Sequence, residues 1–437
     1  MAHESPLPGL PEQPVHRLTA PIARFLHVEA AGGVVLLAAT LVALVLANSP
    51  LSERFLAIWE TRVGFAIGGF AMDHSLKHWI NDGLMAVFFF VIGLEVKREV
   101  VLGELREIKA AALPIVAALG GMIVPAAIYL ALQNGQPGES GWGITMATDI
   151  AFVVGCMAVL GNRVPRSLRV LLLTLAIVDD IGAILVIAIG YTDSLSMVWL
   201  MRGFVGIAIV LLLGRIGVRN LGVYTVLGVL IWLAFHESGV HATIAGVILG
   251  LITPARSAVS HDLVTDTVDR ARALMGGEGW NAASRYAVMR GVEEASRESL
   301  SPLERLENSL HPWVSFLIMP VFALANAGVV MSTEALGDDV ALAIIAGLLL
   351  GKPIGIVGFS WVATRMRLAQ LPEGVSWPIL TAGGFLAGIG FTMALFISSL
   401  ALDETLLDTA KMGVLVASAA AATIGMFMLV RLLPKRS

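Results

Sequence analysis

Charge is scarce in this sequence. Only 14% of its 437 residues are Asp, Glu, Lys or Arg, whereas 57% are hydrophobic and the mean hydropathy is +0.83. Soluble domains usually carry about 25% charged residues, and one soluble core could not bury this much apolar surface. The composition therefore excludes an ordinary soluble globular protein and predicts an integral membrane protein. The 45 glycines fit this class, because small residues let membrane helices pack closely.

Cysteine is almost absent. The one cysteine, Cys156, lies in an apolar run, so it excludes an intrachain disulfide and any zinc or iron–sulfur site built on cysteine spacing. A cleavable signal peptide is not expected either, since the first 26 residues are rich in proline and polar side chains. The first apolar run, from Ala31 to Asn48, is long enough to remain as the first membrane helix.

Long apolar runs are abundant. A window of about 20 apolar residues, the length that spans a bilayer, finds twelve candidates. They cover approximately residues 30–48, 79–96, 111–132, 144–161, 168–190, 196–214, 221–236, 239–253, 312–331, 340–363, 378–400 and 411–430.

The distribution of Lys and Arg predicts the orientation of these spans. Basic residues gather after spans two, four, six and ten and at the end of the chain, whereas the loops after spans three, seven and nine have none. The loop after span one is an exception. Because cytoplasmic loops collect Lys and Arg, both termini are expected in the cytoplasm. The resulting organisation is a cytoplasmic segment (1–28), spans one to eight (29–253), a cytoplasmic loop (254–311), spans nine to twelve (312–431) and a cytoplasmic tail (432–437).

Two connections have local patterns. Residues 61–72 alternate apolar side chains around Gly68-Gly69, which indicates either a small β-hairpin or an irregular loop on the side opposite the cytoplasm. In the charged 254–311 loop, expected to be partly helical, Ser301-Pro302-Leu303-Glu304 combines a Ser cap, Pro at the first helical position and Glu at the third. This pattern predicts a helix start at Pro302.

Buried carboxylates carry the functional signal. Asp179 and Asp180 lie near the centre of span five, where a charge costs roughly 2.5–3.5 kcal/mol on insertion scales. Their side chains point about 100° apart around the helix axis, and their negative charges repel each other. The two carboxylates therefore cannot both take part in the same structural contact. One structural alternative is that one aspartate pairs with a buried cation while the other lines a water-filled cavity. The functional interpretation is a site for a cation or a proton.

Three further features lie at the depth of these aspartates. Thr148 and Asp149, in span four, are poor residues for a helix interior and indicate either a break in the helix or an ordinary N-terminal cap. Glycines cluster in span eleven, from Gly383 to Gly390, and permit either close packing or an interrupted helix. Lys352, in span ten, should pair with one of the span-five aspartates, through either a permanent or a breakable salt bridge.

Charged residues near the ends of spans are less informative. Asp82 and Glu99, in the region of span two, are expected to be interfacial, and Glu95 is borderline because it lies within the apolar run. His241 is expected to be an interfacial histidine with its hydrogen bonds satisfied. His311 lies near a cytoplasmic helix entry, where a histidine can titrate near neutral pH.

Three other classes of membrane protein share some of these features with an ion exchanger. An intramembrane aspartyl protease also uses two buried aspartates, but on separate helices, which the adjacent pair does not offer, and it has no use for Lys352. A channel is disfavoured by the paired interrupted spans. A proton-coupled symporter of a small solute is the remaining alternative.

In the stretches that contain these charged residues and glycines, the chain resembles the NhaA-type sodium/proton antiporters. The matching stretches are WINDGLMAVFFFVIGLEVKRE from Trp79, ATDIAF from Ala147, LAIVDDIGAI from Leu175, GVHATIAGV from Gly239, LHPW from Leu310, FALANAGV from Phe322, GKPIG from Gly351 and GIGFTMALFI from Gly388. The resemblance covers most of the chain, from about residue 22 to residue 430. The segment around residues 255–300 is longer than expected for the family.

The resemblance implies an all-helical fold of twelve transmembrane helices with inverted repeats, in which spans four and eleven are interrupted and cross. It implies that Asp179 and Asp180 bind the cation and protons, that Asp149, Thr148 and Lys352 balance charges at the crossing, and that Lys352 pairs with Asp179. It also implies pH sensing by a cytoplasmic group of charged residues: Glu95, Arg98, Glu99, Glu307 and His311.

The implied activity is electrogenic, pH-regulated export of Na+, and of Li+, in exchange for external protons. The protein would be a secondary transporter and not an enzyme, with no cofactor. Its partners would be Na+, H+, Li+ and the lipid bilayer but no nucleic acid, and the hairpin near residues 61–72 would join two protomers. The implied location is the bacterial inner membrane, with multiple spans.

Overall fold

The fold is almost entirely helical. The computed structural model describes residues 29–67, 70–191, 195–218, 220–257, 261–275 and 282–434. The predicted N-terminal segment 1–28, the glycine pair of the hairpin and the end of the C-terminal tail lie outside these residues.

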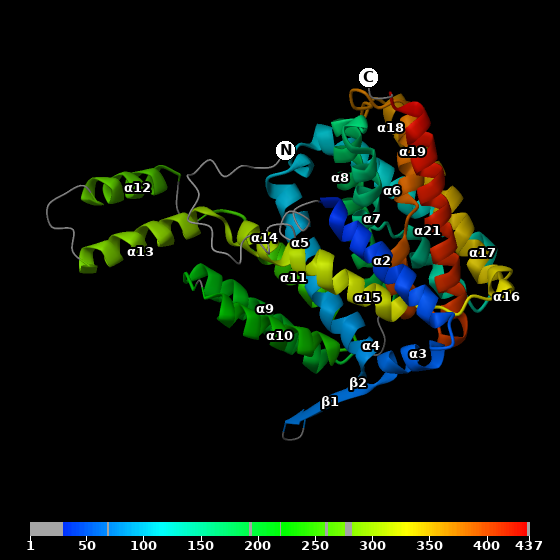
Figure 1. Cartoon of the computed structure of the whole chain (residues 1–437), viewed down its shortest axis with the longest axis horizontal. Coiled ribbons are helices and arrows are strands. Elements are labelled where there is room, and N and C mark those ends of the chain that lie inside the picture. Colours follow the sequence, from blue (N-terminus) through cyan, green and yellow to red (C-terminus); the bar gives the residue numbers. More distant parts are fainter. Residues whose placement is uncertain are drawn as a thin grey trace.

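Figure 1 shows the helices packed into one bundle, with the two strands at one end. The first half of the chain forms α2 (Glu29–Ala47), α3 (Ser52–Glu60), α4 (Leu76–Trp79), η1 (Ile80–Leu84), α5 (Met85–Val101), η2 (Glu104–Arg106), α6 (Ile108–Gln133), η3 (Glu139–Met146), α7 (Ile150–Leu160), η4 (Gly161–Arg163), α8 (Arg166–Gly190) and α9 (Met197–Arg215). The second half forms α10 (Leu221–His236), α11 (Thr243–Ile252), α12 (His261–Met275), α13 (Ala282–Ser299), α14 (Pro302–Trp313), η5 (Val314–Ile318), α15 (Met319–Asn326), α16 (Thr333–Leu336), α17 (Asp339–Ala346), η6 (Gly347–Gly351), α18 (Lys352–Arg365), α19 (Trp377–Ala387), α20 (Phe391–Ala401) and α21 (Glu404–Leu432).

Many of these helices could cross a membrane. Within the described residues, seven helical stretches are long and apolar enough to do so, or up to nine if each of two bent pairs is one span. The predicted spans at 79–96, 221–236 and 239–253 fall on the shorter helices α5, α10 and α11, so the count of twelve stays a prediction. On α9 the apolar side chains of Met201, Phe204 and Leu212 are exposed, as expected of residues that face lipid.

Two helices are interrupted in the middle. The 3-10 helix η3 ends at Met146 and α7 begins at Ile150, which leaves residues 147–149 non-helical. Residues 388–390 separate α19 from α20, and the two halves are bent by 47°. Both alternatives left open for Asp149 therefore apply together, because it lies at a break and caps the helix that follows.

The predicted hairpin forms. Strands β1 (Arg62–Ile67) and β2 (Phe70–Ser75) pair antiparallel, with Arg62 opposite Ser75 and Ile67 opposite Phe70. The irregular-loop alternative is wrong for these residues, and the strands extend three residues beyond the predicted end at Met72. The hairpin leads directly into α4, whose N-cap Ser75 accepts a hydrogen bond from the backbone N–H of His78.

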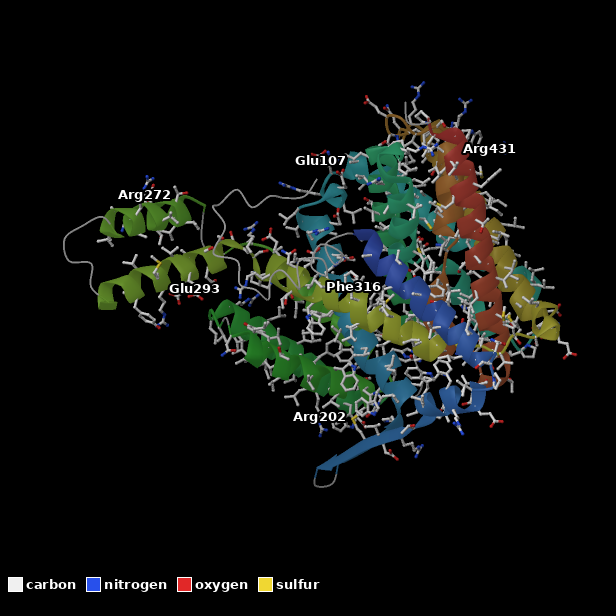
Figure 2. The ribbon with its side chains drawn as sticks, viewed as in Figure 1. Glu107, Arg202, Arg272, Glu293, Phe316 and Arg431 are labelled. Carbon is white, nitrogen blue, oxygen red and sulfur yellow. The ribbon has the colours of Figure 1, made fainter. Side chains whose placement is uncertain are left out.

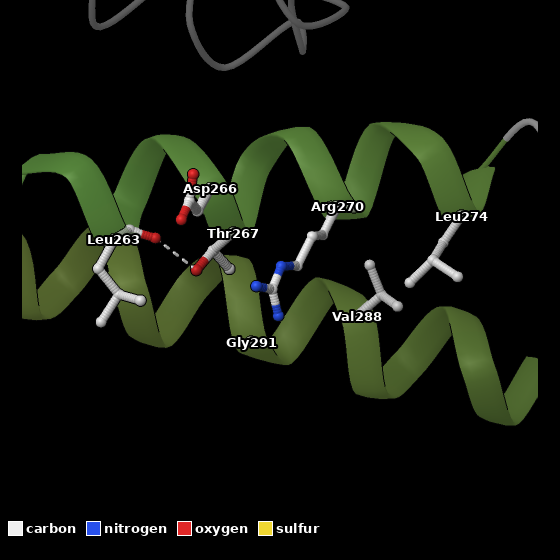
Figure 3. Close-up of a pocket in the computed structure, with 8 residues that line it drawn as sticks. Leu263, Asp266, Thr267, Arg270, Leu274, Val288 and Gly291 are labelled. Atoms are coloured by element: carbon white, nitrogen blue, oxygen red, sulfur yellow. Dashed lines mark hydrogen bonds between the residues drawn. The ribbon is translucent and has the colours of Figure 1, made fainter.

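The 254–311 segment is mostly helical. Helices α12 and α13 pack against each other and project away from the bundle (Figure 1), and a pocket between them is lined by Leu263, Arg270 and Val288 (Figure 3). The predicted capping box is present at the start of α14, where Ser301 and Glu304 bond reciprocally. This helix continues through residue 312 into η5 and α15, so the candidate span begins at Pro302.

Close packing positions Lys352. Helices α6 and α18 approach so closely that a Cβ added to Gly355 would lie 2.1 Å from the carbonyl oxygen of Gly120. Small residues permit this approach, which fixes α18 against the centre of the bundle. The two ends of the bundle are marked in Figure 2 by Glu107 and Arg431 at one end and by Arg202, near the hairpin, at the other.

Candidate functional site

The two helix breaks touch each other. The backbone N–H of Asp149 donates to the carbonyl oxygen of Ile389 at 2.7 Å, and the Thr148 hydroxyl lies 2.9 Å from the carbonyl oxygen of Ala387. Irregular backbone at membrane depth is tolerated only where protein or a cavity satisfies it. Here each break supplies hydrogen-bond partners to the other.

The Asp149 carboxylate joins the starts of two helices. Its Oδ1 accepts from the backbone N–H of Phe152 at 3.1 Å, in the first turn of α7, and its Oδ2 accepts from the backbone N–H of Thr392 at 3.1 Å, in the first turn of α20. The Thr392 hydroxyl also donates to Oδ2. Since helix N-termini have unpaired N–H groups and partial positive charge, one buried carboxylate stabilises both.

This double cap predicts a graded loss of stability. Asp149→Ala removes the acceptors for both helix starts, and a lost N-cap costs about 0.5–2 kcal/mol. Asp149→Asn keeps one side-chain oxygen and should fall between the wild type and the alanine variant. Thermal unfolding in detergent, followed by circular dichroism, measures this order. Equal unfolding temperatures for all three proteins would contradict the double cap.

Lys352 is buried with all of its donors used. Its ammonium group donates to the Met146 carbonyl oxygen at 2.6 Å, to the Thr148 hydroxyl at 2.8 Å and to Asp179 Oδ2 at 2.6 Å. An ammonium group has three N–H donors. Lys352 therefore links α18 to the break before α7 and to the middle of α8, and Asp179 is the partner that the resemblance implied.

The two aspartates on α8 have different surroundings. Both are buried, and Asp179 Oδ2 lies within hydrogen-bonding distance of Lys352 and Thr148. Among the described residues, Asp179 Oδ1 and Asp180 Oδ1 have no hydrogen-bond partner. Lys352 balances the charge of one carboxylate, so the other can be neutralised by a proton or a bound cation. Carboxylate, hydroxyl and carbonyl oxygens are also the ligands that hard cations prefer.

The predicted pH-sensing residues lie at the α5–α14 contact. Arg98 pairs with Glu307 at 2.5 Å and with Glu99 at 3.6 Å, which brings those three together. Glu95 is half-buried one turn earlier on α5, and His311 is exposed one turn after Glu307 on α14. The structure thus places all five residues on two packed helices.

Sequence reasoning missed several members of the site. Thr392 lies in a stretch that matches the NhaA-type antiporters, but no role was predicted for it. The backbone carbonyl groups of the breaks cannot be identified from the types of residue in the sequence. Sequence reasoning also missed a second polar contact, between Asn81 and Asn326. Their amide groups pair at 2.7 and 3.3 Å and connect η1 to α15. Both asparagines are in matched stretches, and a polar residue within an apolar run was the available signal.

The amino-acid sequence is similar to those of known sodium/proton antiporters. The family model of Na+/H+ antiporter 1 matches residues 23–429. The chain is 57% identical to the Na+/H+ antiporter NhaA of Rhodopirellula baltica, over 99% of this chain and 98% of that protein. It is 53% identical to NhaA of Rhizobium meliloti over 98% of both chains, and 47% identical to NhaA 2 of Vibrio vulnificus over 96% and 94%. Because the family match covers residues 23–429 and these identities extend over nearly the full length, the chain belongs to the NhaA family of sodium/proton antiporters.

Proposed function

We propose that the protein exchanges Na+ for protons across a membrane, with Asp179 and Asp180 as the shared binding site. The observation that carries the proposal is the buried pair itself. Asp180 Oδ1 has no hydrogen-bond partner among the described residues. Asp180 directly follows Asp179, which pairs with Lys352 beside the two touching helix breaks. The names of the relatives and the family match support sodium as the cation.

Competition for one site is sufficient for exchange. Sodium and protons both bind carboxylates, so occupation by one displaces the other, provided that the loaded site opens to one side at a time. Asp179 presents one oxygen to Lys352 and Thr148 and has a second without a partner. We propose that Na+ takes the place of the Lys352 ammonium beside Asp179, with Thr148 and the carbonyl groups of the breaks supplying further oxygen atoms. Lys352 then acts as the internal counter-charge when Na+ is absent.

The finer architecture belongs to the same proposal. It comprises twelve spans with inverted repeats over spans three to five and ten to twelve, and both termini in the cytoplasm. The N-terminal segment 1–28, the loop 254–311 and the tail 432–437 would be cytoplasmic, between spans over 29–253 and 312–431. The protein would reside in the bacterial inner membrane as a homodimer joined through the β1–β2 hairpin. No cofactor is needed, since Na+, Li+ and H+ are the transported ions.

Regulation by pH is assigned to the α5–α14 contact. The Arg98–Glu307 pair connects the two helices, with Glu95, Glu99 and His311 within one turn of it on the same helices. A change in protonation would alter the balance of charge in this group, and α5 also packs against α8, which holds the aspartates. We propose that this contact transmits pH to the binding site.

The experiment is sodium-induced collapse of a proton gradient. Everted vesicles from cells that lack their own sodium/proton antiporters are energised, and acridine orange reports the gradient. Addition of Na+ should collapse the gradient only when this protein is present, and choline should have no effect. No response to Na+ at any pH from neutral to alkaline would contradict the proposal. A response to a sugar or an amino acid alone would favour the symporter.

The net charge moved in each exchange cycle is tested with the purified protein under an imposed membrane potential. If one Na+ exchanges for two protons, transport in proteoliposomes should accelerate or slow with the sign of an imposed membrane potential. Insensitivity to the potential would contradict this stoichiometry without contradicting antiport.

A further inference from the structure

Three histidines converge near the hairpin, away from the site described above. His74 lies on β2, His78 on α4 and His236 at the last residue of α10. One ring nitrogen from each of them lies within 4.8 Å of the others. His74 and His78 are four residues apart on consecutive elements, and the fold brings the distant His236 to them.

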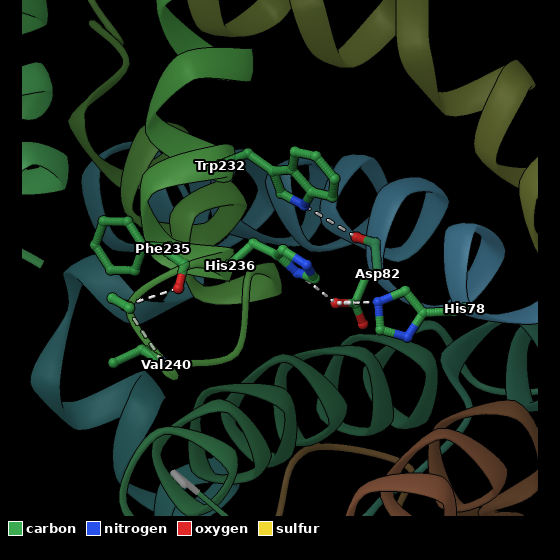
Figure 4. A network of polar contacts seen from close by, with 7 residues as sticks. His78, Asp82, Trp232, Phe235, His236 and Val240 are labelled. Atoms are coloured by element: carbon green, nitrogen blue, oxygen red, sulfur yellow. Dashed lines mark hydrogen bonds and ion pairs between the residues drawn. The ribbon is translucent and has the colours of Figure 1, made fainter. Parts of the chain in front are cut away.

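Asp82 lies between two of these histidines. Its Oδ2 is 3.2 Å from His236 Nδ1 and 3.7 Å from His78 Nε2. Figure 4 shows Asp82 between the rings of these two histidines. Asp82 lies in the π-helical turn η1, and its backbone carbonyl accepts from the Trp232 indole at 3.2 Å. The expectation of an ordinary interfacial carboxylate is therefore incomplete, because the structure gives Asp82 two histidine neighbours.

One ring nitrogen of the cluster lacks a hydrogen bond. Among the described residues, His78 Nε2 is buried without a hydrogen-bond partner. Leaving a buried polar atom unpaired is costly, and such an atom in a folded protein requires an explanation. A metal ion bound at this nitrogen would supply the missing partner.

We propose that His74, His78 and His236, together with Asp82, bind one divalent transition-metal ion of the Zn2+ type. Imidazole nitrogen suits Zn2+, Cu2+ and Ni2+, whereas Na+, Mg2+ and Ca2+ prefer oxygen, so this site is chemically distinct from the buried carboxylates. Asp82 supplies either the fourth ligand or the carboxylate that orients His236 through Nδ1, an arrangement common around zinc.

The arrangement is close to what coordination requires. Zinc holds nitrogen ligands at about 2.0–2.1 Å, which places them roughly 3.4 Å apart around a tetrahedral ion. The ring centroids of His74 and His78 lie 4.2 Å apart, and the rings are nearly parallel, with 22° between their planes. One of these rings must turn to point its nitrogen at a shared ion. The side chain of His78 is 38% exposed although its Nε2 is buried, so the edge of the cluster reaches the surface.

A bound ion would connect three parts of the molecule. His74 belongs to the hairpin, His78 to the helix that follows it, and His236 to the end of α10. Coordination would fix the base of the hairpin to α10, so we expect metal binding to raise the temperature of thermal unfolding. If the hairpin joins two protomers, the ion would also stiffen the element that carries the interface.

Calorimetric titration with Zn2+ tests the site. The full chain is purified without a polyhistidine tag, treated with a chelator and titrated in detergent. We expect the wild type to bind one Zn2+ per chain, and the variant with all three histidines replaced by alanine to bind none. In Asp82→Asn, the affinity for Zn2+ should fall by about 10- to 100-fold. His241→Ala is the matched control. His241 is also half-buried, but its Nε2 contacts the Tyr191 carbonyl oxygen, and it lies outside the cluster. Equal Zn2+ binding by the wild type and the triple variant would overturn the proposal.

A second measurement needs no variant. Diethylpyrocarbonate modifies accessible histidines, and mass spectrometry identifies the modified residues. In the wild type, Zn2+ should slow the modification of His74, His78 and His236 and leave that of the exposed His311 unchanged. Equal rates with and without Zn2+ at the cluster would overturn the site even if the triple variant does not fold. Both measurements are made without an ion gradient, so their failure is separate from any failure of the antiport proposal.

Discussion

Asp180→Asn is expected to abolish the sodium response of energised everted vesicles. The substitution keeps the size of the side chain but removes the carboxylate charge that binds Na+ or a proton in turn. Asp180 is buried, and its neighbour Asp179 is paired with Lys352, so Asp179 alone cannot supply both carboxylates of the proposed site. The sodium-induced gradient collapse should fall to the level of vesicles without the protein.

Three controls make this result specific. Asp180→Glu keeps the carboxylate on a longer chain and should retain part of the response. Asp73→Asn changes an exposed aspartate whose pair with Arg62 is 3.2 Å long at the surface, and it should leave transport unchanged. The unfolding temperature of the purified variants in detergent separates lost binding from lost folding. A normal sodium response in Asp180→Asn would remove this residue from the proposed site.

Lys352→Met is expected to have the largest effect on stability. The substitution leaves Asp179 buried without its counter-charge and also removes the donors to Met146 and Thr148. Breaking a buried ion pair on one side costs about 3–5 kcal/mol, more than most single substitutions. The unfolding temperature in detergent should therefore fall well below that of the wild type.

The double variant distinguishes the charge from the packing. In Lys352→Met combined with Asp179→Asn, neither charge remains, so most of the loss should be recovered relative to Lys352→Met alone. If the double variant is as unstable as the sum of the two single variants, the pair does not act as a unit. In that case the packing of Lys352 against the glycine-rich contact of α6 and α18 would account for its effect.

The sequence by itself determined the class of protein and the residues of interest. Low charge and long apolar runs require a membrane environment, because no soluble core could bury them. Asp179, Asp180 and Lys352 stand out for a reason that needs no coordinates, since a charge within an apolar span is costly wherever the span lies. The capping box at Ser301 is equally local, because its two bonds join residues three positions apart.

Only the tertiary structure decided how these residues meet. The sequence left Asp149 open between a break and a cap, and in the structure it lies at a break and caps α7. Its second oxygen also accepts from Thr392, a residue 243 positions away, which no local pattern could indicate. The choice of Asp179 as the partner of Lys352 depends on the packing of α18 against α6. The histidine cluster depends on a strand, a short helix and the end of α10. Contacts between distant segments are set by helix packing and backbone breaks, and periodicity within one segment contains no information about them.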